Sequence, residues 1–296
     1  DVERSRGLGD VYKRQIEMLV LAQDVQDAEE VRRIMLLADN FHLRVAAVPV
    51  YNDFVTARSE LDSIGGMRYM DLRLMNTCDI MGVNIVVTDM DKTLRLIEEK
   101  LEDWRGKYIC VANVHTTVTA HDDPDYQKVQ NGAVMALPDG GPLSKYSRQQ
   151  GYVDAARVTG PDLMKELLKE SKTKHYRHYF YGSTQKTLDV LREKVTENYP
   201  GAVIAGMYSP PFRPLTPEED EDVVRMINEA KPDFVWVGLG APKQERWMAV
   251  HEDRVQALMV GVGAAFDYEA GNIRRAPQWM QKHNLESVSY THLTLP

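Results

Sequence analysis

The chain has 296 residues, of which 43% are hydrophobic and 27% are charged. This composition is typical of a globular protein and excludes the disordered, collagenous and disulfide-framework classes. Neither cysteine, Cys78 or Cys110, belongs to a CxxC pair, which argues against a disulfide scaffold or a zinc site and favours a reducing, cytosolic compartment. The formal net charge of -8 disfavours binding to nucleic acid. The longest apolar stretch, residues 257–266, is about half of the roughly 20 residues that a membrane-spanning helix needs.

The two ends of the chain have no amphipathic period, and we interpret residues 1–15 and 288–296 as translated sequencing-adapter read-through outside the fold. Residues 16–76 contain an apolar run, a helical pattern and a second apolar run, which predicts a strand-helix-strand unit. This segment resembles the end of the nucleotide-binding-like domain that precedes the catalytic part of polyprenyl-phosphate sugar phosphotransferases. We expect a truncated accessory α/β domain here and assign it no activity.

A second domain is expected over residues 77–287, where apolar runs alternate with helical patterns of 3.6-residue period. One helix start is marked by Thr216 and Glu219, the sequence of a capping box. The runs at 233–240 and 257–266 are almost continuously apolar, as buried parallel strands require. The sequence therefore predicts a Rossmann-like open, mostly parallel sheet with helices on both faces.

Ligands of open α/β sheets bind beyond the carboxyl ends of the strands, so the loops after the apolar runs are where a site is expected. Asn113 and Thr116 follow one run, and such side chains either contact a ligand or cap the next helix. Asp139 lies in a PDGG turn after another run. Its carboxylate either acts as a general base or only supports its own turn.

Two later loops contain glycines that allow close approach to the backbone. In one, the glycines lead into a helix near Pro242, whose free N–H groups form a natural cradle for a diphosphate. In the other, Asp267 could bind a sugar hydroxyl, and Arg274 and Arg275 could bind phosphates. The alternative is that these side chains form a structural ion pair. The pattern is neither a Walker A loop nor GxGxxG. The candidate binding residues are Gly238, Gly240, Lys243, Gln244, Glu245, Gly263, Asp267, Arg274 and Arg275.

The order of the motifs resembles the WecG/TagA/CpsF glycosyltransferases over residues 78–286. The residues that carry the resemblance are VNIVVTDMDKTL, Asn113, LPDGGPL, ARVTGPDL, YGS, PPF, GLGAPKQERW and GVGAAFDYEAGNIRRAPQWMQKHNLE. The family implies transfer of N-acetylmannosamine or a similar hexose from UDP to the 4-hydroxyl of GlcNAc on undecaprenyl diphosphate, with inversion. This reaction belongs to teichoic acid or other cell-surface polysaccharide biosynthesis.

The resemblance also implies roles for single residues. Asp139 corresponds to the proposed base, and Asn113, Arg157 and Gln244 match polar residues of the family's active site; we add Thr116 and Gly182 to the expected substrate-binding set. No metal or other cofactor is expected. The sequence Asp89-Met90-Asp91 has DxD spacing, but the pattern around it favours a helix start.

The sequence departs from the family at Val111, where relatives often have threonine, and at 283–287, where HNLES replaces GLEW. The arginine-rich C-terminal appendage of the family is missing, so we expect weak docking on the inner face of the cell membrane and poor turnover. The expected partners are a UDP-sugar and a lipid-linked GlcNAc acceptor. The sequence does not decide whether the protein forms a homo-oligomer. The alternatives are a nucleotide-dependent oxidoreductase and a non-catalytic nucleotide-sugar sensor.

Overall fold

The computed structural model describes residues 18–21, 33–35, 38, 44–47, 61–64, 67–72, 75–273 and 275–276. The chain divides into two compact units, Asp1–Asn76 and Thr77–Pro296, and each is described by itself. Both segments that we interpret as adapter read-through, 1–15 and 288–296, lie outside the described residues.

The first unit contains a four-stranded sheet in the order β1-β2-β4-β3. Its strands are β1 (Met18–Leu21), β2 (Arg44–Ala47), β3 (Leu61–Ile64) and β4 (Met67–Leu72). The parallel pair β1 and β2 coincides with the two apolar runs of the expected strand-helix-strand unit. The resemblance of this unit to the accessory domain of phosphotransferases stays a prediction.

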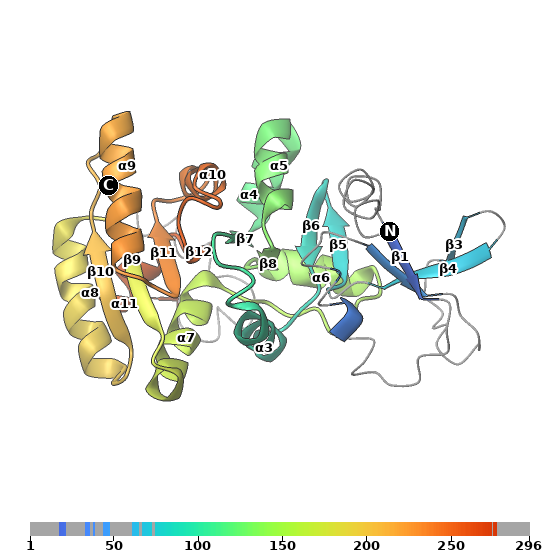
Figure 1. Ribbon diagram of the computed structural model, residues 1–296, viewed down its shortest axis with the longest axis horizontal. Coiled ribbons are helices and arrows are strands. Elements are labelled where there is room, and N and C mark those ends of the chain that lie inside the picture. The colour runs from blue at the N-terminus through green and yellow to red at the C-terminus, as the bar shows by residue number, and fades with distance from the viewer. Residues whose placement is uncertain are drawn as a thin grey trace, which may run out of the picture. The chain divides into compact units, whose positions relative to one another are not determined.

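The second unit is built on a six-stranded sheet in the order β10-β9-β11-β12-β7-β8, and all its neighbouring strands are parallel (Figure 1). This arrangement confirms the predicted α/β class. The strands are β7 (Tyr108–Ala112), β8 (Met135–Pro138), β9 (Arg177–Gly182), β10 (Val203–Tyr208), β11 (Phe234–Gly238) and β12 (Leu258–Gly261).

Helices pack around this sheet and bury its central strands. Every residue of β11 from Phe234 to Val237 has 0% exposure, so both of its faces are covered. The helices are α3 (Met90–Lys100), α4 (Val114–Asp122), α5 (Pro124–Gly132), α6 (Gly141–Gln149), α7 (Gly160–Lys174), α8 (Gln185–Asn198), α9 (Pro217–Glu229), α10 (Lys243–Val250) and α11 (Ala265–Glu269).

A two-stranded hairpin precedes α3 and packs on the edge of the sheet at β8. It is formed by β5 (Thr77–Ile80) and β6 (Val83–Val86). Its apolar side chains share a buried cluster with Ala136 of β8 and Tyr126 of α5. The hairpin therefore extends the core of the second unit.

Two predicted helix starts are confirmed. Asp89 is the N-cap of α3, where its Oδ1 accepts a hydrogen bond of 2.8 Å from Lys92 N–H. Thr216 and Glu219 form a reciprocal capping box on α9. One boundary was wrong: the apolar run at 257–266 ends as a strand at Gly261, and Ala265 and Phe266 belong to α11. Periodicity cannot separate a buried strand from the start of a buried helix.

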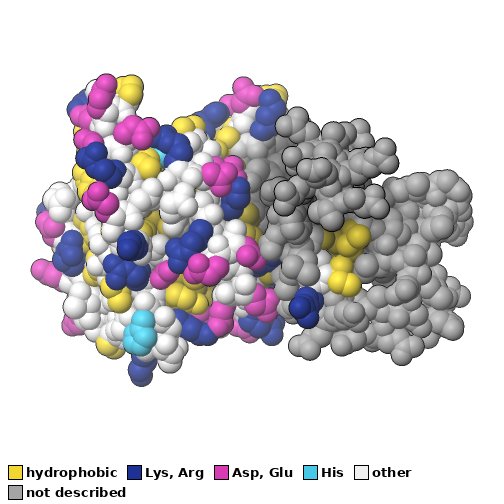
Figure 2. Space-filling model, in the orientation of Figure 1, with side chains coloured by type: hydrophobic (Ala, Val, Ile, Leu, Met, Phe, Trp, Pro, Cys, Tyr) yellow, Lys and Arg dark blue, Asp and Glu magenta, His cyan; other side chains and the backbone are white. Residues whose placement is uncertain are grey.

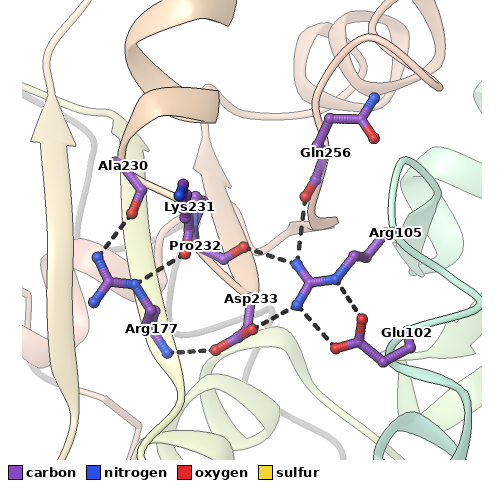
Figure 3. A network of polar contacts seen from close by, with 8 residues as sticks. All are labelled: Glu102, Arg105, Arg177, Ala230, Lys231, Pro232, Asp233 and Gln256. Carbon is purple, nitrogen blue, oxygen red and sulfur yellow. Dashed lines mark hydrogen bonds and ion pairs between the residues drawn. The ribbon is translucent and has the colours of Figure 1, made fainter.

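The amino ends of the strands are held by a network of charged side chains (Figure 3). Asp233, just before β11, accepts hydrogen bonds from Arg105 Nη2 at 3.0 Å and from Arg177 N–H at 2.8 Å. Arg105 also binds Glu102 and the carbonyl oxygens of Pro232 and Gln256. These contacts join segments that are distant in sequence, so this edge of the sheet has a structural role.

Candidate functional site

The expected site residues lie at the opposite edge, beyond the carboxyl ends of the parallel strands. The connection after β9 runs outward to β10, whereas the connection after β11 runs the other way to β12. The ends of β9 and β11 therefore form a topological switch point, where open α/β sheets bind ligands. Loops after β7, β8 and β12 reach the same edge because all six strands are parallel.

Asn113 and Thr116 form a capping box at the start of α4, so the capping alternative holds for both. Asn113 Oδ1 accepts a hydrogen bond of 3.1 Å from Thr116 N–H, and Asn113 N–H donates to Thr116 Oγ1 at 2.9 Å. The Thr116 hydroxyl also donates to the Asn113 carbonyl, and the residue is 2% exposed. The box uses Oδ1 of Asn113 and leaves its amide NH₂ group to other contacts. Roles of either residue in substrate binding stay predictions.

Asp139 is half-buried and lies directly after β8. Its N–H donates to the carbonyl of Ala112 at 2.8 Å, and its own carbonyl accepts a hydrogen bond of 2.8 Å from Arg157 Nε. The turn also passes close to the helix start at α4, because a Cβ built on Gly140 would lie 3.6 Å from Asn113 Cα. The structure thus brings Asn113, Asp139 and Arg157 together.

Arg275 pairs with Asp162, on the first turn of α7. Its Nη2 lies 3.0 Å from Asp162 Oδ2, which also accepts a hydrogen bond of 2.7 Å from the Thr159 hydroxyl. Burial opposes ionisation of Asp162, but the hydrogen bonds from Arg275 and Thr159 outweigh it, so the pKa of this carboxyl lies below its ordinary value. The nearby charge of Arg157 acts in the same direction. Arg275 and Arg157 therefore share one acidic neighbour.

Asp267 takes part in a separate set of contacts. Its Oδ1 accepts hydrogen bonds from Asn272 Nδ2 at 3.0 Å and from Thr187 Oγ1 at 3.4 Å. Thr187 lies in the first turn of α8, so the carboxylate connects α11 to α8. Arg274, expected beside it, lies outside the described residues.

The four expected glycines serve two different purposes. Gly182 has a φ of +123°, and a Cβ on it would lie 2.4 Å from the carbonyl oxygen of Gly238; one on Gly238 would lie 2.9 Å from the ring of Phe266. These two allow close packing at the switch point. Gly240 and Gly263 have φ values of +77° and +54°, and a Cβ on either meets no described atom within 4 Å. Among the described residues, nothing therefore crowds the backbone at these two positions.

The start of α10 connects these two loops. Gln244 N–H donates to the carbonyl of Gly240 at 2.9 Å, and Gln244 Oε1 accepts a hydrogen bond of 3.1 Å from Gly263 N–H. Gln244 and Glu245 are buried, at 3% and 0% exposure, whereas Lys243 is exposed. Lys243 is thus accessible to an anion, and the other two lie beneath the surface.

Charge is mixed on the face of the molecule shown in Figure 2, where Lys and Arg side chains alternate with Asp and Glu over the described residues. Among those same residues, no group of three or more His, Cys, Asp and Glu is arranged to hold a metal ion. Within the described part of the chain, no helix is both long enough and apolar enough to cross a bilayer.

The ion pair given as the alternative for Arg275 is present, but the partners in two contacts at this edge were not predicted from sequence. The pairing of Arg275 with Asp162 joins residues 113 positions apart, and the bond from Gly263 to Gln244 joins two loops. Only the first contact involves a segment with a recognisable local sequence pattern. Thr159 and Asp162 have the [ST]-x-x-[DE] spacing of a helix start, and Thr159 is indeed the N-cap of α7.

An open parallel sheet with a carboxylate, an amide, two arginines and two glycine loops at its carboxyl edge is typical of enzymes that bind nucleotides. A sequence profile of the "Glycosyl transferase WecG/TagA/CpsF family" matches residues 78–290. The chain therefore belongs to the WecG/TagA/CpsF glycosyltransferase family, as the order of motifs predicted.

Individual relatives agree with this assignment. The N-acetylglucosaminyldiphosphoundecaprenol N-acetyl-beta-D-mannosaminyltransferase of Bacillus spizizenii is 34% identical over 199 residues, covering 66% of this chain and 74% of the relative. The protein of the same name from Bacillus subtilis is 32% identical over 216 residues, covering 72% and 82%. That of Staphylococcus aureus is 30% identical over 213 residues, covering 71% and 82%.

Proposed function

We propose that this protein is an inverting glycosyltransferase that moves N-acetylmannosamine from its UDP donor to the 4-hydroxyl of GlcNAc on undecaprenyl diphosphate. The names of its relatives support the transferred sugar and the lipid-linked acceptor. Family membership favours it over the oxidoreductase and the nucleotide-sugar sensor. The product would serve teichoic acid or another cell-surface polysaccharide. A lipid-linked acceptor also implies that the protein works as a peripheral protein at the cytoplasmic face of the membrane.

In this proposal the Asp139 carboxylate is the general base. A sugar hydroxyl is a poor nucleophile at neutral pH, so a base must take its proton as the oxygen attacks the anomeric carbon. The bond to UDP breaks on the opposite side, and this single displacement inverts the anomeric centre. The observation that carries the assignment is the fixed backbone of Asp139, which is bound to the end of β7 and to Arg157 Nε.

The departing UDP needs hydrogen-bond donors that are already in place, because negative charge develops on its diphosphate. The proposal assigns this task to the loops at Gly240 and Gly263, together with Lys243. Arg157 would add planar donors on the side of Asp139, and Arg275, whose two Nη atoms bind Asp162, would contribute its positive charge. Asn113, beside the PDGG turn, would contact a sugar hydroxyl through its amide NH₂ group.

The test is a panel of UDP-sugars with a short-chain GlcNAc-diphosphate-lipid, following UDP release. UDP-N-acetylmannosamine should give the highest turnover, and proton NMR of the product should show the inverted linkage. Asp139→Asn should lower kcat at least about 100-fold, the usual contribution of a general base, while UDP still binds. The control is Asp125→Asn, since Asp125 is an exposed residue of α5. Undiminished turnover in Asp139→Asn would contradict the assignment of the base.

A further inference from the structure

Glu245 is a charged residue with no exposed surface, on the first turn of α10. Its Oε1 accepts a hydrogen bond of 2.8 Å from Gln244 Nε2. Burial raises the pKa of its carboxyl, and contacts with Gln244 and the Tyr126 hydroxyl oppose that rise. A residue with 0% exposure does not reach a ligand at the surface, so any effect of Glu245 on the site passes through its neighbours.

The neighbour that contacts both glycine loops is Gln244. Its Oε1 accepts the hydrogen bond from Gly263 N–H, and its backbone N–H donates to Gly240. Glu245 Oε1 accepts a hydrogen bond from Gln244 Nε2, and this bond holds the NH₂ group of the amide on the side of Glu245. The amide oxygen then faces Gly263. In the reversed orientation, two donors would face each other at Gly263 and the bond would be lost.

We infer that Glu245 is a positioning residue for the diphosphate of the donor: it orients the Gln244 amide, which holds the Gly263 loop in register with the Gly240 loop. The inference rests on the proposed function. It is supported by the position of both glycines just after β11 and β12, at the carboxyl edge of the sheet, where open α/β sheets bind ligands. A shift of one loop relative to the other would change the spacing of two loops that must contact the same diphosphate.

The experiment measures UDP binding by calorimetry and the hydrogen exchange of the peptide containing Gly263. Glu245→Met removes the acceptor at similar volume, and it should raise the Kd for UDP about tenfold and speed exchange at Gly263. Glu245→Gln keeps an acceptor oxygen, so it should stay within about threefold of the natural protein. If Glu245 only filled space, Glu245→Met would leave the Kd for UDP nearly unchanged.

The control is Ser171→Ala, since Ser171 is a fully buried polar residue that bonds to His178 and Leu167, away from the glycine loops. It should lower the melting temperature and leave the Kd for UDP unchanged. Should Glu245→Met fail to fold, Glu245→Asp replaces it. Its shorter side chain keeps the carboxyl group but withdraws the acceptor from Gln244, so it should also weaken UDP binding.

The inference is overturned if the Met or Asp variant binds UDP as tightly as the natural protein, or if Glu245→Gln is as weak as they are. A natural protein that binds no UDP would instead refute the proposed function. Hydrogen exchange then still tests the positioning role. Faster exchange at Gly263 in Glu245→Met but not in Glu245→Gln supports that role, and equal exchange in the two refutes it.

Discussion

We expect His178 to make the stability of the second unit sensitive to acid. It is fully buried at the start of β9, between Ser171 and Trp236. Trp236 Nε1–H donates to His178 Nδ1 at 3.0 Å, and the Ser171 hydroxyl is committed to the carbonyl of Leu167. Nε2 therefore carries the proton and donates to Ser171 Oγ. A second proton on Nδ1 would face the Trp236 donor, and burial lowers the pKa of His178 to about 3.

The size and sign of the effect follow from linkage. An unfolded histidine has a pKa of about 6.5, so between pH 6.5 and pH 3 the unfolded chain binds one more proton at this position than the folded chain. Stability is therefore lost as the pH falls below 6.5. Going from pH 7 to pH 5, His178 should lower the free energy of unfolding by about 2 kcal/mol.

The assay is urea unfolding at pH 7 and pH 5, compared between the natural protein and His178→Phe. The phenyl ring keeps the stacking on Phe234 and Trp236 but cannot be protonated. The variant should be less stable at both pH values, yet its loss between them should be smaller by about 2 kcal/mol. His121→Asn, at an exposed position, is the control for removing one imidazole. Equal losses in the natural protein and in His178→Phe would refute the reasoning.

Two further substitutions test the edges of the sheet. Gly182→Ala should cost about 3 kcal/mol or more, because the methyl group adds a clash with the Gly238 carbonyl to the strain of a positive φ. Gly271→Ala, also at positive φ but in open surroundings, should cost only about 1 to 2 kcal/mol in denaturant unfolding; equal costs would exclude the clash. Arg105→Met should lower the free energy of unfolding by about 1 to 3 kcal/mol and leave kcat unchanged. Its control is Arg225→Met, because Arg225 forms an exposed i,i+3 ion pair, and this variant should lose less than about 0.5 kcal/mol. A lowered kcat in Arg105→Met would show that the amino edge is coupled to the site.

Much of the architecture was predictable because its signals are local. Runs such as 233–240 are too apolar for a half-exposed strand and must be covered on both faces, which implies a parallel sheet between helices. The helix starts at Asp89 and Thr216 could also be predicted, because a helix cap involves residues only three positions apart. The order of the motifs identified the family.

The arrangement of the site depends on long-range packing that local patterns do not encode. The strand order places β12 between β11 and β7, and this order brings the Gly263 loop to Gln244. In the same way, the fold joins Arg275 to Asp162 across 113 positions. Side-chain types and their spacing along the chain determine helices, strands and contacts within a turn, whereas contacts between loops form only once the whole core has packed.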